Sequence, residues 1–431
     1  MKQEKQLKKV LILFFLCAVS FPLVVYFLPL KISAKVHRVD YHNRTEELSF
    51  STWSNASFQF SFEKYLNDHL GLYPSFVRLR NQLDYSLFKI AHTGQVVNGV
   101  NNYLFEKVYI DAHFGLDFVG DHVIDSTTNA LKVLQDTLAA RGKLALFCLA
   151  TGKCSYYPEY IPYTEEQHKT NKQGYLEAFN KKGINYIDCA PWFLSMRDSM
   201  KHHLFPKYGI HWSYYSTVLV TDSIVNYIND RTQWNLPELS IIKKEISNTP
   251  RYYDDDVAQS MNLLVDVESP PMVYPVHEWS KTAHEKKSLL IIGDSFTWDI
   301  LDRSRIGTEC FDSIQFFYYN QSVHPPHKVA GIQKLTRHLD LQKVIDHFDA
   351  FLFISNEPNL INGGWGFADN AIQLFKDSSF VPEERNNKLL RNKCNNSPTW
   401  RADLESRAKK RNITLDSMVN IYLHDRTFKP Y

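Results

Sequence analysis

Four short, compact apolar runs set the strongest limit on how this chain can fold. Stretches with helical spacing separate them, for example Ser126 to Arg141 and Ser216 to Asn229. Runs of this kind are typical of strands that are buried on both faces of a parallel sheet. The alternation predicts an α/β fold, with a doubly wound parallel sheet and helices on both faces. The four runs are Leu144–Leu149, Leu289–Ile292, Ile314–Tyr318 and Phe351–Ile354.

Composition agrees with a folded chain and argues against one class of function. A length of 431 residues is enough for a sizeable core. The 49 Lys and Arg residues nearly balance the 47 Asp and Glu residues, which leaves a net charge of +2. A dedicated nucleic-acid-binding protein normally carries a strong basic excess or patch. We therefore expect no nucleic-acid partner.

The cysteines and histidines give no metal or redox motif. None of the six cysteines pairs with another at CxxC spacing, so a zinc cage or a redox dithiol is not indicated. His202, His203 and His211 match no standard zinc signature. We expect no metal and no cofactor, and the pairing of the cysteines stays open.

The N-terminal segment predicts a membrane anchor. Val10 to Leu30 contains no charged residue and follows a leader rich in lysine. At about 1.5 Å per residue, such a helix spans a hydrocarbon core of about 30 Å. The lysines predict a single-pass protein of the inner membrane, with a cytoplasmic N-terminus and a large periplasmic or extracytoplasmic domain. The alternatives are a signal peptide cleaved near Ser33 and Ala34, or a buried core helix.

The rest of the chain follows this segment of residues 1–31 in three predicted parts. Residues 32–57 are polar and irregular and indicate a stalk. Residues 58–382 form the main domain, with a helical part at 58–95 and a loop-rich insertion at about 232–287. Residues 383–431, rich in Arg, Lys and Asn, form a basic C-terminal appendage.

The sharpest chemical signal is Gly293-Asp294-Ser295, which directly follows an apolar run. In an open α/β sheet, ligands bind beyond the carboxyl ends of the strands. Ser295 would lie there at the start of a helix, where free N–H groups favour developing negative charge. The alternative is that Ser295 only caps the helix and Asp294 only shapes the turn.

A histidine motif upstream offers a base for this serine. His211 and Trp212 lie in the sequence Tyr-Gly-Ile-His-Trp-Ser over residues 208–213. A serine hydroxyl is a weak nucleophile until a base takes its proton, and histidine is the usual base near neutral pH. The alternative is a structural histidine beside an aromatic residue.

Together, the two motifs resemble the SGNH-hydrolase-like domain of the periplasmic alginate O-acetyltransferase family. The likeness rests on Gly293-Asp294-Ser295-Phe296 and His211-Trp212, with the histidine motif first, as in the family. Residues 62–69, 97–105 and 153–162 are similar to the family's FE-x-Y-x-x-DH, V-x-G-x-x-G-W-LF and K-x-x-x-YPE-x-x-P motifs. The five motifs follow the family order over about residues 58–360.

The resemblance implies an O-acetyltransferase that modifies a cell-surface or exported polysaccharide. Ser295 would carry the acyl group, His211 would act as its base, and a membrane-bound O-acyltransferase partner would supply the acyl group. A carbohydrate esterase or deacetylase is one alternative, and a non-catalytic scaffold or binding subunit of a polysaccharide export complex is another. The candidates for oxyanion or substrate binding are Gly293, Asp294, Asn356, Trp212 and Tyr319.

One departure from the family pattern concerns the acid of the expected triad. The family motif is Asp-x-His-Trp, and Gly209 stands here in place of its aspartate. Loss of the acid partner of a triad can cost about four orders of magnitude in rate. Asp188 and Asp222 are possible replacements, with nothing in the sequence to favour either. The run Asp254-Asp255-Asp256 predicts a solvated loop.

Overall fold

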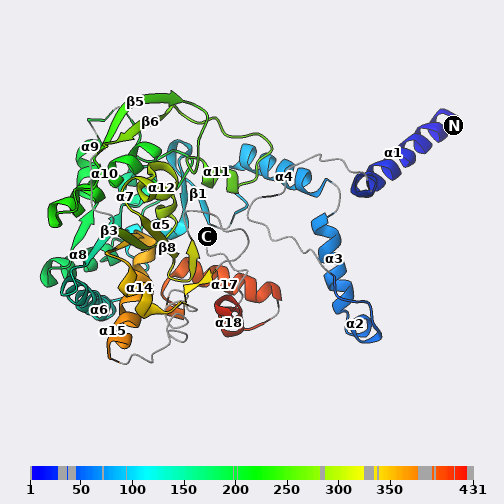
Figure 1. Cartoon of the computed structure of the whole chain (residues 1–431). Helices are drawn as coiled ribbons and strands as arrows, with labels where there is room; N and C mark the ends of the chain where they lie inside the picture. Colours follow the sequence, from blue (N-terminus) through cyan, green and yellow to red (C-terminus); the bar gives the residue numbers. More distant parts are fainter. Residues whose placement is uncertain are drawn as a thin grey trace. The chain divides into compact units, whose positions relative to one another are not determined.

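The computed structural model divides into two compact units, each of which is described by itself (Figure 1). The first comprises residues 1–93 and 258–267, and the second comprises residues 94–257 and 268–431. The described residues are 2–27, 36, 45–69, 72–93, 95–197, 199–200, 202–281, 287–324, 334–336, 339–376, 391–392, 395–411 and 413–424.

A seven-stranded sheet forms the centre of the second unit (Figure 1). Its strands are β3 (Leu144–Ala150), β4 (Tyr186–Asp188), β7 (Ser288–Gly293), β8 (Ser313–Tyr318), β9 (Ser322–His324), β10 (Lys334–Leu335) and β11 (Ala350–Asn356). Their order is β10-β9-β8-β7-β11-β3-β4. The five strands from β8 to β4 are parallel, whereas β9 and β10 are antiparallel to their neighbours. The predicted mixed α/β fold with a mostly parallel sheet is confirmed.

Helices and two small ribbons complete the second unit. The ribbons pair β1 (Val96–Asn98) with β2 (Leu104–Glu106), and β5 (Leu239–Ser247) with β6 (Met272–Trp279). The α-helices are α5 (Lys107–Phe114), α6 (Asp121–Ala139), α7 (Lys153–Tyr156), α8 (Asn171–Lys182), α9 (Ala190–Arg197), α10 (Tyr214–Arg231), α11 (Asp256–Ser260, which extends into the first unit), α12 (Phe296–Ser304), α13 (Ile306–Glu309), α14 (Leu341–His347), α15 (Phe367–Lys376), α17 (Pro398–Arg411) and α18 (Leu415–His424). Short 3-10 helices cover Val100–Asn102, Pro158–Tyr160 and Glu357–Gly366.

Side chains on both faces of the central strands are buried. Every residue of β7 and β11 is buried. Successive side chains of a strand point to opposite faces, and Phe317 belongs to a cluster with side chains of α6, α8 and α15. The preceding residue, Phe316, instead contacts Trp298 of α12. Helices therefore cover both faces, which explains why the central strands are continuous apolar runs.

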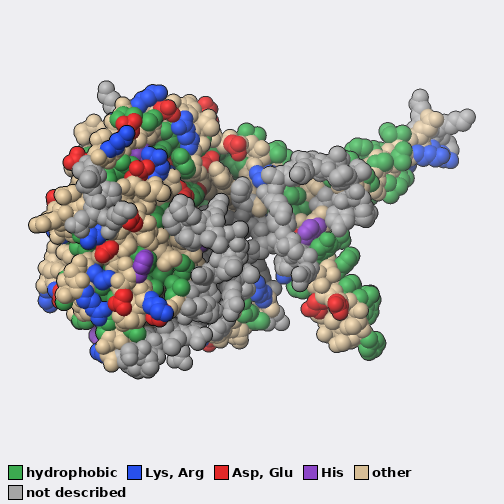
Figure 2. All heavy atoms as spheres, in the orientation of Figure 1, with side chains coloured by type: hydrophobic (Ala, Val, Ile, Leu, Met, Phe, Trp, Pro, Cys, Tyr) green, Lys and Arg blue, Asp and Glu red, His purple; other side chains and the backbone are tan. Residues whose placement is uncertain are grey.

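The region predicted to be a loop-rich insertion contains the β5–β6 ribbon. Its β5 strand is mostly solvent-exposed, with a register shift between Ile241 and Lys243. A ribbon with one open strand does not need a strict apolar alternation, which accounts for its weak signal in the sequence. On the face that Figure 2 shows, basic and acidic side chains are interspersed over the second unit.

The first unit contains α1 (Lys2–Phe27), α2 (Phe50–Ser54), α3 (Ser57–His69) and α4 (Tyr73–Phe88). The helical stretch predicted from residue 58 is two helices, and Pro74 lies in the first turn of the second one. Proline fits that position because the first N–H groups of a helix have no partner within it. Asn81 donates a hydrogen bond of 2.8 Å from Nδ2 to the carbonyl of Met261, which ties α4 to residues 258–267.

Within the described residues, no helix combines the length and the apolar character that crossing a membrane requires. The predicted anchor, Val10 to Leu30, overlaps α1, and residues 28–30 lie outside the described ranges. The anchor is therefore not supported. The boundaries proposed for the anchor, stalk, main domain and C-terminal appendage stay predictions.

Replacing Phe353 with alanine is expected to lower the free energy of unfolding by about 3–5 kcal/mol, because it leaves a cavity in the core. Phe353 is 1% exposed and stacks on Phe147, with 4.7 Å between ring centroids. Ile246→Ala is the control, since Ile246 is 68% exposed and should change stability by less than about 0.5 kcal/mol. Chemical denaturation measures both, and equal effects would contradict this account of the core.

Candidate active site

Ser295 lies where strand β7 passes into helix α12. The strand ends at Gly293, and the helix begins at Phe296. Although Ser295 occupies the cap position, its side chain makes no capping hydrogen bond. Its Oγ lies 2.9 Å from Nε2 of His211 instead. The interpretation of Ser295 as a mere helix cap therefore does not fit its contacts.

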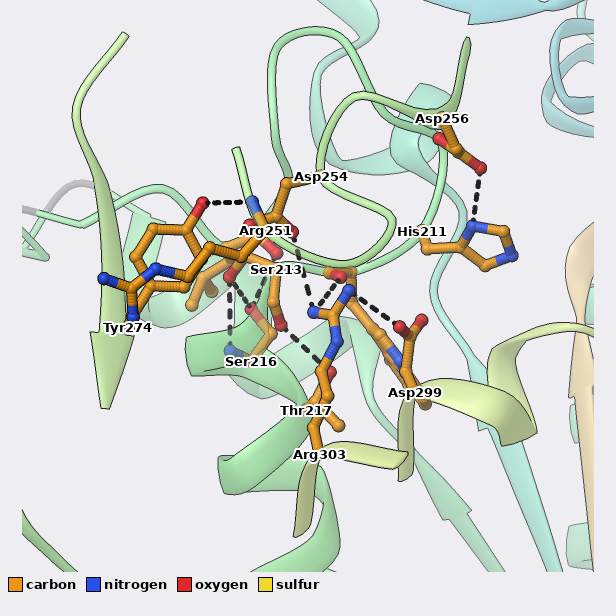
Figure 3. A network of polar contacts seen from close by, with 12 residues as sticks. His211, Ser213, Ser216, Thr217, Arg251, Asp254, Asp256, Tyr274, Asp299 and Arg303 are labelled. Carbon is orange, nitrogen blue, oxygen red and sulfur yellow. Dashed lines mark hydrogen bonds and ion pairs between the residues drawn. The ribbon is translucent and has the colours of Figure 1, made fainter. Parts of the chain in front are cut away.

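His211 lies directly before helix α10, whose start fixes the histidine segment. Ser213 is the N-cap of this helix, and its Oγ accepts a hydrogen bond of 3.2 Å from the N–H of Ser216. The imidazole is hydrogen-bonded at both nitrogens. Nδ1 lies 2.9 Å from Oδ2 of Asp256 (Figure 3). Nε2 lies 2.9 Å from Oγ of Ser295. A serine, a histidine and an aspartate thus stand in line, which is the arrangement of a catalytic triad.

Asp256 is the residue that the sequence analysis missed. It is the first residue of α11, and its Oδ1 accepts hydrogen bonds from the N–H groups of Ile210 and Val257, at 3.0 and 2.9 Å. The prediction of a solvated loop over residues 254–256 is wrong, because Asp254 is only 2% exposed and Asp256 supports His211. Forty-five residues separate Asp256 from His211, so no local spacing indicates the pair.

The two acids proposed from the sequence have other partners. Asp188 pairs with Lys172, with 2.9 Å between Oδ1 and Nζ. Asp222 accepts a hydrogen bond from the side chain of Asn226. Within the described residues, neither acid forms a hydrogen bond or an ion pair with His211.

Gly209 stands where the family motif has an aspartate, and its lack of a side chain makes room for the loop that carries Asp256. An ideal Cβ placed on Gly209 would lie 2.6 Å from the carbonyl oxygen of Tyr253 and 2.9 Å from the backbone of Asp254. No real Cβ tolerates such distances. Because residue 209 has no side chain, the loop of residues 251–256 can approach the histidine segment, and Asp256 then lies within hydrogen-bonding distance of His211.

The charge of Asp256 determines the protonation of His211. Burial of the imidazole lowers its pKa, but the charge of Asp256 and its hydrogen bond outweigh this and raise the pKa to about 9. The imidazole of the resting site is therefore protonated near neutral pH. Its neutral form, which can accept a proton from Ser295, becomes more populated as the pH rises.

Asp294 and Asn356 fix the turn that carries Ser295. Oδ1 of Asp294 accepts from the N–H of Phe296 at 3.0 Å, and Oδ2 accepts from the N–H of Asn356 at 2.7 Å. The Asn356 side chain donates from Nδ2 to the hydroxyl of Tyr109 at 2.9 Å. Asn359 adds a hydrogen bond from its Nδ2 to Oδ2 of Asp294 at 3.0 Å. These contacts join the ends of β7 and β11, and the predicted oxyanion role of Asn356 stays a prediction.

The other predicted site residues are packed into the fold. Trp212 is fully buried against Phe296, with 5.1 Å between their rings. Tyr319 is buried in the cluster on the opposite face of the sheet, where it meets Trp365 edge-on. Gly293 has no room for a side chain, because a Cβ there would lie 2.3 Å from Oγ1 of Thr297. The oxyanion or substrate-binding roles of all three stay predictions.

Over the described ranges, no group of three or more His, Cys, Asp or Glu side chains is arranged to hold a metal ion. The groups that lie together at the end of β7 are Ser295, His211 and Asp256. A base next to a hydroxyl, itself oriented by a carboxylate, can activate that hydroxyl as a nucleophile toward an acyl group.

Comparison with known proteins finds likeness among solved structures. No family model matches this chain, and no curated protein matches it. The O-acetyltransferase domain of Pseudomonas putida AlgJ is 12% identical over 62% of this chain and 91% of that chain, with a TM-score of 0.42. Bacillus cereus PatB1 with a sulfonyl adduct is 12% identical over 62% and 95%, with the same TM-score.

Pseudomonas aeruginosa AlgX is 10% identical over 64% of this chain and 67% of that chain, with a TM-score of 0.42. This chain is thus similar to the structures of AlgJ, PatB1 and AlgX, at low identity and over part of its length. Likeness at this level concerns the path of the chain and not its chemistry.

Asp256→Asn is expected to destabilise the protein more at about pH 6 than at about pH 10. The folded pKa of His211, about 9, lies above its ordinary value of 6.5. The stability that this shift contributes is fully present below the ordinary pKa and is lost as the pH rises through the folded pKa. Denaturant titration at both pH values measures the difference, with the exposed Asp346→Asn as control. A pH-independent difference would contradict the assigned contact.

Gly209→Ala is expected to lower the free energy of unfolding by about 1–3 kcal/mol, as overpacking does. It should also lower the pKa of His211, because the loop that carries Asp256 must move away. Gly174→Ala is the control, since the one close approach of its Cβ, 2.5 Å, is to the terminal methyl of Ile124, which can rotate aside. Denaturation and NMR titration of the imidazole measure the two effects. An unchanged pKa in Gly209→Ala would show that the loop does not depend on this contact.

Proposed function

We propose that this chain is an O-acyltransferase that transfers an acyl group, most simply acetyl, to a cell-surface or exported polysaccharide through a serine acyl-enzyme. The observation that carries the proposal is the line of contacts from Ser295 through His211 to Asp256. Two hydrogen bonds of 2.9 Å on opposite nitrogens of one imidazole serve no evident packing need. They weigh against a purely structural histidine and a non-catalytic scaffold.

The first half-reaction forms the acyl-enzyme. Oγ of Ser295 attacks the acyl carbonyl carbon while Nε2 of His211 takes the hydroxyl proton. The bond between the carbonyl carbon and the donor's leaving group then breaks, and the imidazolium returns the proton to that group. Asp256 holds the imidazole with Nδ1 protonated and stabilises its positive charge. The oxyanion of the tetrahedral intermediate forms beside the start of α12, where backbone N–H groups favour negative charge.

The second half-reaction moves the acyl group to the acceptor. A sugar hydroxyl gives its proton to His211 and attacks the serine ester. The ester bond to Ser295 breaks, and Oγ recovers a proton from the imidazolium. Water in place of the sugar hydroxyl would make the same site an esterase, so the acceptor decides between the two reactions.

The SGNH-hydrolase-like character of the fold, a periplasmic or extracytoplasmic location and a membrane-bound O-acyltransferase partner are further parts of the proposal. Their support is the resemblance of the sequence motifs to the alginate O-acetyltransferase family. An acyl donor outside the cytoplasm would require such a supplier.

Ser295→Ala is expected to abolish labelling by a serine-directed sulfonyl or phosphonate probe, because it removes the nucleophilic oxygen. His211→Ala should slow labelling by at least about a thousandfold, since it removes the imidazole that is hydrogen-bonded to Oγ of Ser295. Mass spectrometry of the intact protein and of its peptides measures the rate and the labelled residue. Ser195→Ala, which removes an exposed hydroxyl, is the control.

Transfer is tested with an acetyl-ester donor, with and without an oligosaccharide acceptor. Acetylated oligosaccharide formed by wild type and not by Ser295→Ala supports the transferase. Hydrolysis alone, with no acetylated sugar, would make the protein an esterase. Wild-type protein that takes no label at Ser295 would overturn both reactions.

A further inference from the structure

The guanidinium of Arg303 is buried. Arg303 lies in α12, about two helical turns after Ser295, which occupies the cap position at the start of that helix. Its side chain is 0% exposed, and Nη2 lies 2.8 Å from Oδ1 of Asp299 on the same helix. Nη1 lies 3.6 Å from Oδ1 of Asp254, in the loop that leads into Asp256. The guanidinium carbon also lies 5.2 Å from the ring centroid of Tyr252. Figure 3 shows Arg303 between the two carboxylates.

This one side chain contacts the three segments that carry the triad. It belongs to α12, which follows Ser295. Its Nη1 also lies 3.5 Å from the carbonyl oxygen of Trp212, the residue after His211. Asp254, its partner in the loop, precedes Asp256 by two residues. A guanidinium suits this place because its planar, forked donors can serve several acceptors at once.

The two carboxylates need this cation. Burial raises the pKa of Asp254 to about 7 and that of Asp299 to about 6, and the charge of Arg303 acts against both shifts. Two buried carboxylates without a counter-ion repel each other and are strongly disfavoured. Without Arg303, the loop of residues 251–256 would lose an anchor on α12, and Asp254 would tend toward solvent.

We propose that Arg303 is a positioning residue of the site: by holding Asp254 against α12, it keeps the loop of residues 251–256 in place and Asp256 on the imidazole of His211. The proposal rests on the proposed function, in which Asp256 supports His211. Arg303 does not touch the reacting atoms. It acts on catalysis only through the placement of Asp256, which distinguishes it from a residue that stabilises the fold alone.

A double-mutant cycle between Arg303→Met and Asp256→Asn tests this coupling. The readout is the rate at which the sulfonyl probe labels Ser295 in the full chain. Arg303→Met should slow labelling at least tenfold, and should slow it far less in a protein that already carries Asp256→Asn. Arg303→Lys keeps the positive charge but lacks the forked donors of the guanidinium, so its labelling rate should lie between those of wild type and Arg303→Met. Arg305→Met is the matched control, because Arg305 follows α12 and is 60% exposed.

The proposal would be overturned if the double mutant slowed labelling by the product of the two single-mutant factors. It would also be overturned if Arg303→Met were labelled at the wild-type rate. If Arg303→Met fails to fold, Asp254→Asn removes the same ion pair with an isosteric side chain and should show the same coupling. If Asp254→Asn folds and its Ser295 is labelled at the wild-type rate, the proposal fails.

A second readout does not need activity. The Nδ1–H proton of His211 should give a downfield NMR signal in wild type that weakens in Arg303→Met and Asp254→Asn but persists in Arg305→Met. Persistence of the signal in all four proteins would overturn the role of Arg303. Absence of labelling in wild type, with the NMR pattern as expected, would instead refute the proposed function and leave the positioning intact.

Discussion

The hydrogen bond between Nδ1 of His211 and Asp256 is the interaction on which the candidate site depends. It raises the pKa of the imidazole, fixes which nitrogen faces Ser295, and joins two segments that lie far apart in the sequence. A serine hydroxyl beside an unsupported histidine would be a weaker nucleophile. The surrounding structure can be understood as a set of contacts that keep this one bond in place.

Three features of the fold serve this purpose. Strand β7 ends beside β11 in the parallel sheet. There Asp294 accepts hydrogen bonds from Asn356, the last residue of β11, and from Asn359, and these contacts shape the turn before Ser295. Gly209 leaves space for the backbone of residues 253–254. Arg303 of α12 forms an ion pair with Asp254, which belongs to the same loop. The line of contacts from Ser295 through His211 to Asp256 thus depends on tertiary contacts from four separate segments of the chain.

The central strands and the serine turn could be predicted because their signals are local. An apolar run that is buried on both faces is visible without knowledge of its neighbours, and Gly293-Asp294-Ser295 directly follows one. His211 could be named as a candidate because its motif, taken together with the serine motif, resembles a known family. Asp256 could not be found in this way, because the contact depends on how a distant loop folds back. A run of three aspartates resembles a solvated segment unless its buried partners are known.

Arg303 and Gly209 illustrate the same limit. An arginine in an amphipathic helix usually points to solvent, and only the tertiary structure shows that two carboxylates enclose this one. Gly209 appeared in the sequence as the loss of an acid. In the structure, the small size of Gly209 allows another acid, Asp256, to reach His211. A departure from a family motif therefore required its three-dimensional context before it could be interpreted.

The most direct test of this account compares the probe-labelling rate of Ser295 in three proteins: Asp256→Asn, Asp188→Asn and Asp222→Asn. Each substitution replaces one candidate acid with an amide of nearly the same shape. The account predicts that Asp256→Asn slows labelling by orders of magnitude, about four at most, while the other two stay near the wild-type rate. A wild-type rate in Asp256→Asn, or an equal loss in Asp188→Asn or Asp222→Asn, would contradict the assignment of Asp256 as the acid that supports His211.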